Sequence, residues 1–267
     1  GSAIAFSTVV FQTITNNRIL TPSIIGLDSL YLLIQTFIIF LFGSTNLTLM
    51  NQHVNFGISV VLMILFALLL YHFLFKREGN IYFLLLIGLI FGTFFSSLSE
   101  FMQVLIDPNE FQVIQDAMFA SFNNVNTDLF YVSVLLMGLA TLYFLKFEKY
   151  LDVLSLGKDT AINLGVEYDR VVQRLFIIIA VLISVATVLV GPITFLGLLV
   201  ANVAYEFLKT YRHRVLIFGA MLVSIIALVA GQLIVERIFT FSTTISVIIN
   251  FIGGVYFIYL LLRESRA

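Results

Sequence analysis

Four polar residues recur along one apolar stretch of the sequence and are the first candidates for chemistry. They follow one another at steps of three, four and three residues and are Glu100, Gln103, Asp107 and Glu110. This spacing places side chains on one face of a helix. Carboxylates inside a membrane helix are costly and commonly line a solute or ion pathway. Glu100, Gln103 and Asp107 therefore predict a vestibule, unless the lower residues only mark the solvated end of the helix.

Other catalytic or ligand-binding motifs are missing from the sequence. Neither the nucleotide phosphate loop G-x-x-x-x-G-K-[ST] nor the hydrolase motif G-x-S-x-G occurs. There is no cysteine, which excludes disulfides, zinc-thiolate sites and cysteine nucleophiles. His53, His72 and His213 have no second ligand at i+3 or i+4, so we expect interfacial or solvated histidines and no metal site. We predict that the chain is not an enzyme and holds no cofactor.

Membrane-spanning helices are predicted to position these residues. The 267 residues are 60% hydrophobic and 11% charged, with a mean hydropathy of +1.07, which is too apolar for a water-soluble domain. Long apolar runs without polar alternation favour helices over barrel strands. The predicted fold is all-α and polytopic, with about nine membrane segments near residues 1–15, 27–42, 55–75, 81–105, 129–146, 170–190, 193–207, 213–236 and 245–262.

Two places in this pattern are irregular. The sequence opens on Gly1-Ser2, and its first apolar stretch is too short to span a membrane alone, so we expect a truncated start. No basic segment or cleavage motif there indicates a signal peptide. Gly191-Pro192 interrupts a later apolar run, which indicates either a broken helix that lines a wet pathway or a kinked packing helix.

Lysine and arginine predict the orientation in the membrane. The net charge is only −1, so the distribution of charge is more informative than its sum. Alternating spans place all fourteen Lys and Arg except Arg237 on the side of residues 76–80, together with the C-terminus. That side is predicted to be cytoplasmic. The loops at 43–54 and 106–128 contain no basic residue and are predicted to face outside.

One inside loop is unlike a simple connector. Residues 151–170 read LDVLSLGKDTAINLGVEYDR, in which Gly157 and Gly165 separate two short amphipathic stretches. The pattern predicts two small helices joined by glycine. Their apolar side needs a cover, which is either lipid headgroups or another protein. Residues 151–168 are called the elbow below.

Four strings resemble, in the same order, signature segments of the FecCD-type permeases of ABC importers. These permeases carry iron-siderophores, haem and vitamin B12. The strings are GPITFLGLLVANVA (191–204), like the family's GPIxFxGLxxPHxxR; NNRILTPSIIGLDS (16–29), like the segment after its second helix; LSLGKDTAINLGV (154–166), like its cytoplasmic LxLGxxxAxxLGV; and IINFIGGVYFIYLLLR (248–263), like its closing helix. NRILTPSIIGLDSLYLL and GQLIVERIFTFSTTISVIINFIGG look most like the branch serving catecholate-type siderophores such as petrobactin.

The resemblance implies a ten-helix permease fold and several partners. Residues 1–267 would form one transmembrane domain that lacks the first helix and part of the second. The partners implied are a second permease subunit, identical or paralogous, two ATPase subunits that hold ATP and Mg²⁺, and an extracytoplasmic siderophore-binding protein. The assembly would lie in the cytoplasmic membrane of a bacterium, and this chain would hold no metal ligands.

The resemblance also implies roles for individual residues. Coupling to the ATPase falls on the elbow residues Leu156, Gly157, Ala161, Leu164 and Gly165. The inner gate matches Asn17, Ile19, Ile81 and Tyr82. Outside, Arg237 would dock a glutamate of the binding protein. The sequence departs from the signature at residues 201–205, where Ala201-Asn202 replaces the family's Pro-His, and no role is carried over there.

These observations predict the permease subunit of an ATP-binding-cassette importer that takes up ferric siderophore by alternating access. One rival is an ion- or proton-coupled secondary transporter with Glu100 as its coupling carboxylate. Another is a membrane-embedded scaffold with no transport role, for which the elbow would be a plain docking site. Dependence of uptake on an ATPase separates the first prediction from the secondary transporter.

Overall fold

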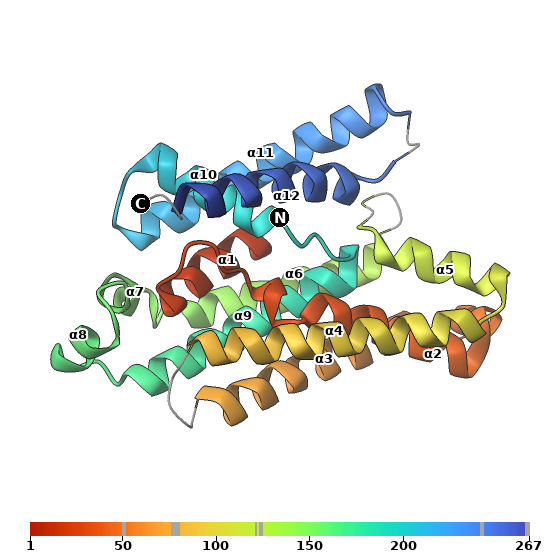
Figure 1. Cartoon of the computed structure of the whole chain (residues 1–267), viewed down its shortest axis with the longest axis horizontal. Coiled ribbons are helices and arrows are strands. Elements are labelled where there is room, and N and C mark those ends of the chain that lie inside the picture. The colour runs from red at the N-terminus through yellow and green to blue at the C-terminus, as the bar shows by residue number, and fades with distance from the viewer. Residues whose placement is uncertain (50–51, 76–80, 121, 123–124, 241–242, 265–267) are drawn as a thin grey trace. The chain divides into compact units, whose positions relative to one another are not determined.

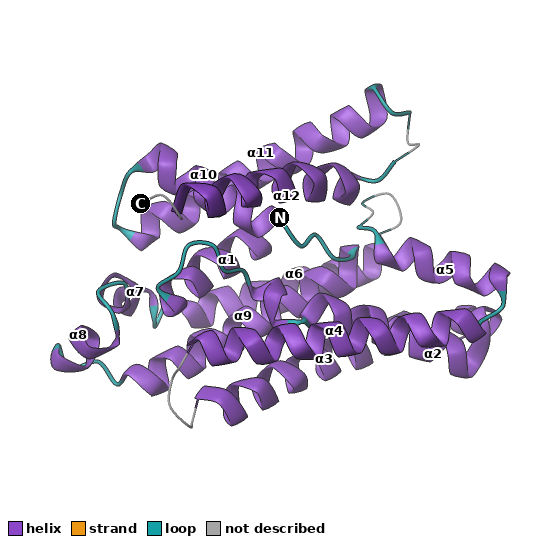
Figure 2. Cartoon of the chain, viewed as in Figure 1, coloured by secondary structure: helices purple, strands orange, loops and turns teal. Residues whose placement is uncertain are grey.

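The computed structural model describes residues 1–49, 52–75, 81–120, 122, 125–240 and 243–264. All the regular elements within these ranges are helical, as Figure 2 shows. In chain order they are α1 (Ser2–Thr15), the 3-10 turn η1 (Pro22–Ile25), α2 (Leu27–Leu49), α3 (Gln52–Phe75), α4 (Ile81–Leu105), α5 (Pro108–Met118), α6 (Thr127–Phe144), α7 (Glu148–Leu154), α8 (Lys158–Asn163), α9 (Tyr168–Val190), α10 (Leu196–Leu208), α11 (His213–Arg237) and α12 (Ile245–Glu264).

Several of these helices are suited to a membrane. Within the described residues, five are long and apolar enough to cross one, namely Gln52–His72, Leu86–Leu105, Thr127–Phe144, Tyr168–Val190 and His213–Arg237. Shorter apolar helices cover Ser2–Thr15, Leu27–Gly43, Leu196–Leu208 and Ile245–Leu260. The all-α prediction is confirmed, and a helix lies at each predicted segment. The number that cross the membrane stays a prediction.

One compact unit comprises residues 23–135 and 184–192. In this unit the end of η1 and Gly26, just before α2, approach α4 so closely that backbone meets backbone. A Cβ added at Gly88 would lie 2.9 Å from Ile25 Cα, and one at Gly26, where φ is +87°, would lie 3.0 Å from Gly92 Cα. Small residues permit this approach, which is a common way of packing helices in lipid.

Successive polar residues of α2 hold both neighbouring helices of this unit. Gln35 Nε2 donates to Ser59 Oγ of α3 at 3.1 Å. The Thr36 and Ser99 hydroxyls of α2 and α4 share a hydrogen bond of 2.8 Å, and Gln103 Nε2 donates to Ser99 Oγ at 3.0 Å. Bonds of this kind fix helix pairs in a membrane, where the hydrophobic effect does not drive helices together.

The polar face predicted from Glu100 to Glu110 is interrupted. α4 ends at Leu105, and Asp107 caps the separate helix α5 by accepting a hydrogen bond from the Asn109 N–H at 2.9 Å. The prediction of one shared helical face is therefore wrong for Asp107 and Glu110. The physical reason is Pro108, which disfavours helical conformation at the preceding residue and cannot donate a backbone hydrogen bond.

The apolar run at Gly191-Pro192 is broken, not kinked. α9 ends at Val190, and α10 begins only at Leu196. Gly191 has φ +101°, and a Cβ there would lie 2.9 Å from Ala120 Cα. A side chain is thus excluded both by the backbone conformation and by the neighbouring backbone.

The other compact unit comprises residues 1–22, 136–183 and 193–267. Its centre is α1, in which every residue from Ala5 to Thr15 is buried. α1 packs against α7, α10 and α11, and α12 packs against α10 and α11 (Figure 1). This unit contains the elbow and the loop at Asn16–Ile19, so the residues discussed next are described within one frame.

Candidate functional site

The elbow contains two short helices separated by left-handed glycines. Gly157, with φ +97°, precedes α8, and Gly165, with φ +83°, follows it. A Cβ at either position would meet no atom within 4 Å, so backbone conformation and not space requires glycine. The predicted pair of helices is confirmed, although α7 begins at Glu148, before the first residue of the elbow.

The elbow leaves part of its apolar surface uncovered. Leu151, Leu154 and Ala161 are buried and attach the two helices to the rest of the chain. Leu156 and Leu164, on either side of α8, are 60% and 61% exposed. Exposed apolar side chains beside a short, charged helix form a surface that a partner protein can cover.

Asp152 joins the elbow to α11. Its Oδ1 accepts hydrogen bonds from the backbone N–H of His213 at 2.9 Å and from the His213 ring Nδ1 at 2.6 Å. Arg212, the residue at the N-cap of α11, makes no side-chain capping bond, so Asp152 supplies the cap from another helix. The solvated alternative for His213 is wrong, because its side chain is 7% exposed and bonded to Asp152, whereas the interfacial alternative stays a prediction.

Electrostatics at this contact favour a charged carboxylate. Burial raises the pKa of Asp152, but the hydrogen bonds from His213 and the charges of His213 and Arg212 outweigh burial and lower the pKa below its ordinary value of 3.8. The partial positive charge at the start of a helix acts in the same direction. Asp152 is therefore a stable anionic anchor for the first turn of α11.

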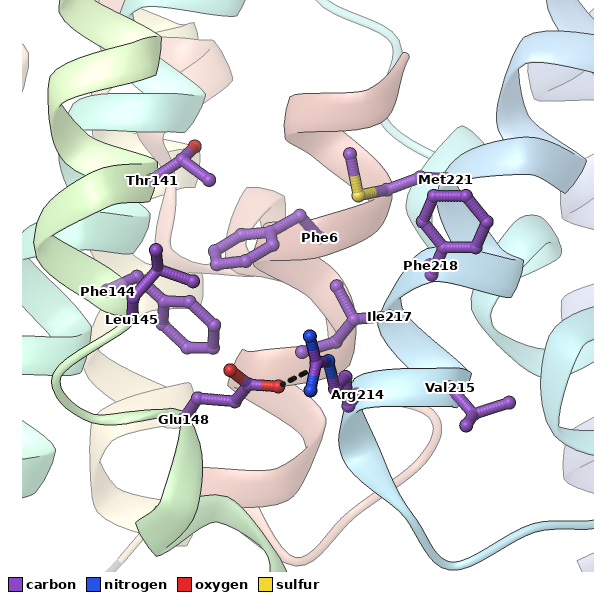
Figure 3. A pocket seen from close by; sticks show the side chains of 10 residues that line it. All are labelled: Phe6, Thr141, Phe144, Leu145, Glu148, Arg214, Val215, Ile217, Phe218 and Met221. Carbon is purple, nitrogen blue, oxygen red and sulfur yellow. Dashed lines mark ion pairs between the residues drawn. The ribbon is translucent and has the colours of Figure 1, made fainter.

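A second link between α7 and α11 lies one turn along α7. Arg214 Nε lies 3.6 Å from Glu148 Oε1, at the edge of an apolar pocket of about 430 Å³ between α1, α6, α7 and α11. Figure 3 shows Phe6 and Phe144 facing each other in this pocket, with ring centroids 4.6 Å apart. The Arg214 side chain is 88% exposed, so this ion pair contributes little stability.

The loop after α1 is fixed by polar contacts. Asn17 Oδ1 accepts from the Ile19 N–H at 2.9 Å. The Arg18 carbonyl accepts from Gln12 Nε2 of α1 at 2.5 Å and from Asn202 Nδ2 of α10 at 3.1 Å. The predicted gate residues Asn17 and Ile19 thus lie in a tightly held turn. Ile81 and Tyr82 begin α4, and their side chains lie outside the described residues.

Sequence reasoning missed two residues that hold this loop. Asn202 bonds the Arg18 carbonyl, and the Tyr205 ring lies 4.5 Å beneath the Arg18 guanidinium. Both fall where the sequence departs from the family signature, so no role was expected there. A buried asparagine in an apolar helix was the available signal, because a buried amide needs a bonding partner.

A polar cavity connects this loop with the elbow. Its volume is about 330 Å³, and Gln12 Oε1, which lines it, is buried without a hydrogen-bond partner. The lining residues come from α1, the loop after it, the residue that follows α7, α10, the α10–α11 connection and the start of α11. They are Gln12, Thr13, Asn16, Asn17, Arg18, Ser155, Tyr205, Thr210, Tyr211, His213 and Leu216. The predicted gate loop and the elbow therefore border one common space.

The remaining predicted site residues that the structure describes are not among those that line this cavity. Glu100 is exposed on α4, whereas Gln103 bonds Ser99 in the packing of α2 against α4. Asp107 is the cap of α5. Arg237 is the last residue of α11, exposed, with its Nε 3.9 Å from Glu236 Oε1. The vestibule and docking roles stay predictions.

Comparisons with known proteins show the family of the chain. Residues 1–263 match the FecCD transport family. The petrobactin import system permease protein YclO of Bacillus subtilis (strain 168) is 66% identical over 268 residues, covering 100% of this chain and 85% of that protein. The petrobactin import system permease protein FatC of Bacillus anthracis is 37% identical over 261 residues, covering 97% and 74%.

The fold is also found in a solved structure. A chain described as an inward-facing conformation of a metal-chelate type ABC transporter superposes with a TM-score of 0.85 and covers 98% of this chain and 83% of its own length. The sequence identity is 22%, so the likeness concerns the fold.

Proposed function

Because the chain belongs to the FecCD transport family, we propose that it is the permease subunit of an ATP-binding-cassette importer for a ferric siderophore of the petrobactin class. The observation that carries the substrate class is the 66% identity to a petrobactin import permease along the whole chain. The 37% identical relative is also a petrobactin import permease, which supports the same substrate class.

The chain depends on a partner for ATP. Its sequence contains no phosphate-binding loop, so ATP and Mg²⁺ belong to ATPase subunits. The elbow is the proposed contact, with exposed Leu156 and Leu164 entering a cleft of the ATPase and the turns at Gly157 and Gly165 setting the direction of α8. The proposal requires a cytoplasmic elbow and C-terminus and a chain in the bacterial plasma membrane, and the distribution of lysine and arginine supports this orientation.

Transport then follows from alternating access. ATP binding closes the ATPases, the elbow moves with them, and the loop at Asn17 and Ile19 opens or closes the inner end of a pathway shared with a second permease subunit. A binding protein outside delivers the cargo near Arg237. The permease needs no metal ligand, because the iron stays wrapped in its chelator.

Reconstituted uptake tests the proposal. Proteoliposomes would hold the full-length permease, its partner permease and the ATPase, and the binding protein would be supplied on the extracytoplasmic side. Uptake of radiolabelled ferric petrobactin would be measured with and without ATP. The test variants are Leu156→Asp and Gly165→Asp. Val113→Asp, which charges a comparably exposed apolar residue on α5, is the matched control for ATPase association.

Two results separate the readings. Uptake that requires ATP, with loss of ATPase association in the elbow variants but not in Val113→Asp, supports the importer and its elbow. Uptake driven by an ion gradient without the ATPase, and unchanged by Leu156→Asp, would contradict the importer and favour the secondary transporter. Uptake of a ferric hydroxamate in place of ferric petrobactin would contradict the substrate class alone.

A further inference from the structure

The contact between α7 and α11 is polar where most helix contacts of this unit are apolar. Two residues one turn apart on α7, Glu148 and Asp152, reach the first two residues of α11, His213 and Arg214. The His213 ring is buried, while the Arg214 pair is exposed to solvent. The bonds of Asp152 to His213 are thus the firm part of this contact.

Hollow space lies on both sides of that contact. The apolar pocket of about 430 Å³ begins at Glu148 and Arg214, as Figure 3 shows. The polar cavity of about 330 Å³ begins at Ser155 and His213. Packed side chains transmit displacement because they resist compression, whereas a cavity does not. At the direct contact of α7 with α11, Asp152 and His213 are therefore the firm link, beside the route through α1, which packs against both helices.

From His213 the chain leads back to the loop at Asn16–Ile19. Residues 209–212 connect α11 to α10, and α10 holds the loop through Asn202 and Tyr205. The path from the elbow to the loop thus consists of one polar bond pair, one short connection and two side-chain contacts. All of these lie in the same compact unit.

We propose that Asp152 and His213 form a strut that transmits movement of the elbow to the inner loop, and so are positioning residues for transport. The inference rests on the proposed function and extends it beyond the leucine and glycine residues of the elbow. It identifies the donor at His213 Nδ1 and the acceptor at Asp152 Oδ1 as the atoms that must stay joined.

Two substitutions of His213 distinguish a strut from a packing role. His213→Asn keeps a side-chain donor near the position of ring Nδ1 but loses volume, whereas His213→Phe keeps the volume and loses the donor. The strut predicts that ATP-driven uptake per assembled complex falls about tenfold in His213→Phe and much less in His213→Asn, within the range typical of coupling between sites. A role in packing alone predicts the opposite order.

Asp152→Ala completes the experiment. Combined with either His213 variant it should remove the difference between them, because residues that act as a pair are not additive. Copurification of the ATPase should be retained in every variant, since the exposed leucines of the elbow are unchanged.

The outcomes decide two questions separately. Uptake in His213→Phe equal to or above that in His213→Asn, or wild-type uptake in both, overturns the strut while leaving the importer in place. Absence of ATP-driven uptake in the wild-type complex contradicts the proposed function instead. The strut is supported if uptake is higher in His213→Asn than in His213→Phe and if this difference between the two variants vanishes in the Asp152→Ala background.

Discussion

A Cβ atom added at Gly197 would lie 2.1 Å from the hydroxyl oxygen of Thr8, which is fully buried on α1. Thr8 thus occupies the space that any other residue at position 197 would need. This relationship fixes how closely α10 crosses α1, the helix at the centre of the unit that contains the elbow.

Gly197→Ala should therefore destabilise the protein. Overpacking of this kind costs about 1–3 kcal/mol, because backbone or side chains must move. Thr8→Ala should restore most of the loss in the double variant, since it removes the clashing atoms. Thermal unfolding in detergent measures both, with Gly138→Ala as the control, because a Cβ there meets no atom within 4 Å. Equal unfolding temperatures for Gly197→Ala and Gly138→Ala would refute the close crossing.

Two glycines of α4, one turn apart, should differ in their tolerance of alanine. A Cβ at Gly88 would lie 2.9 Å from Ile25 Cα, a backbone atom that cannot rotate away, whereas one at Gly92 would lie 3.4 Å from Gly26 Cα. Gly88→Ala should cost about 1–3 kcal/mol and Gly92→Ala clearly less. Denaturant titration in mixed micelles orders the two, with Gly57→Ala as the open-space control. A larger loss in Gly92→Ala than in Gly88→Ala contradicts the packing of α2 against α4.

Asp152 should make stability depend on pH in the acid range. Its pKa in the folded protein is lowered from 3.8, so its contribution is present above that value and disappears as the pH falls through the lower, folded pKa. The difference in unfolding temperature between wild type and Asp152→Asn should be constant above about pH 5 and shrink below pH 3.8. Thermal scans at a series of pH values measure it, and a difference that grows on acidification would be inconsistent with a lowered pKa.

Arg237→Glu should weaken docking of the binding protein without unfolding the permease. The Arg237 side chain is 79% exposed, and its pair with Glu236 is worth less than about 1 kcal/mol. Reversing a charge at the rim of an interface mainly slows association and changes its salt dependence. Association rates measured at low and high salt test this, with Arg237→Lys as the charge-preserving control. Equal rates for both variants would remove Arg237 from the interface.

Apolar periodicity located the helices because the constraint in lipid is local. Each span must satisfy its own backbone, so a long apolar run such as residues 175–190 is readable without knowledge of its neighbours. Helix α5 was not predicted from apolar runs, because it is short and amphipathic. Its Asp107-Pro108 start carries an N-cap and a proline at the first turn, which is the sequence signal that could have revealed it.

The glycines of the elbow predicted its helices, but nothing in the sequence predicted how the elbow is attached to α11. Gly157 and Gly165 indicate left-handed turns in the sequence itself, whereas the bond of Asp152 to His213 joins residues 61 positions apart. The contacts of Gln103 were not predictable for a similar reason. A polar residue in a membrane helix can serve a pathway or bond a neighbouring helix, and only the structure shows Gln103 beside Thr36 and Ser99.

The exposed leucines of the elbow have a consequence for the life of the subunit before assembly. Leu156 and Leu164 present an apolar surface to water until a partner covers them. A newly inserted permease without its ATPase is therefore a target for chaperones and proteases, and its half-life in the cell should lengthen as the ATPase becomes available to bind it. The surface that we propose couples ATP hydrolysis to transport would thereby adjust the amount of permease to the amount of ATPase.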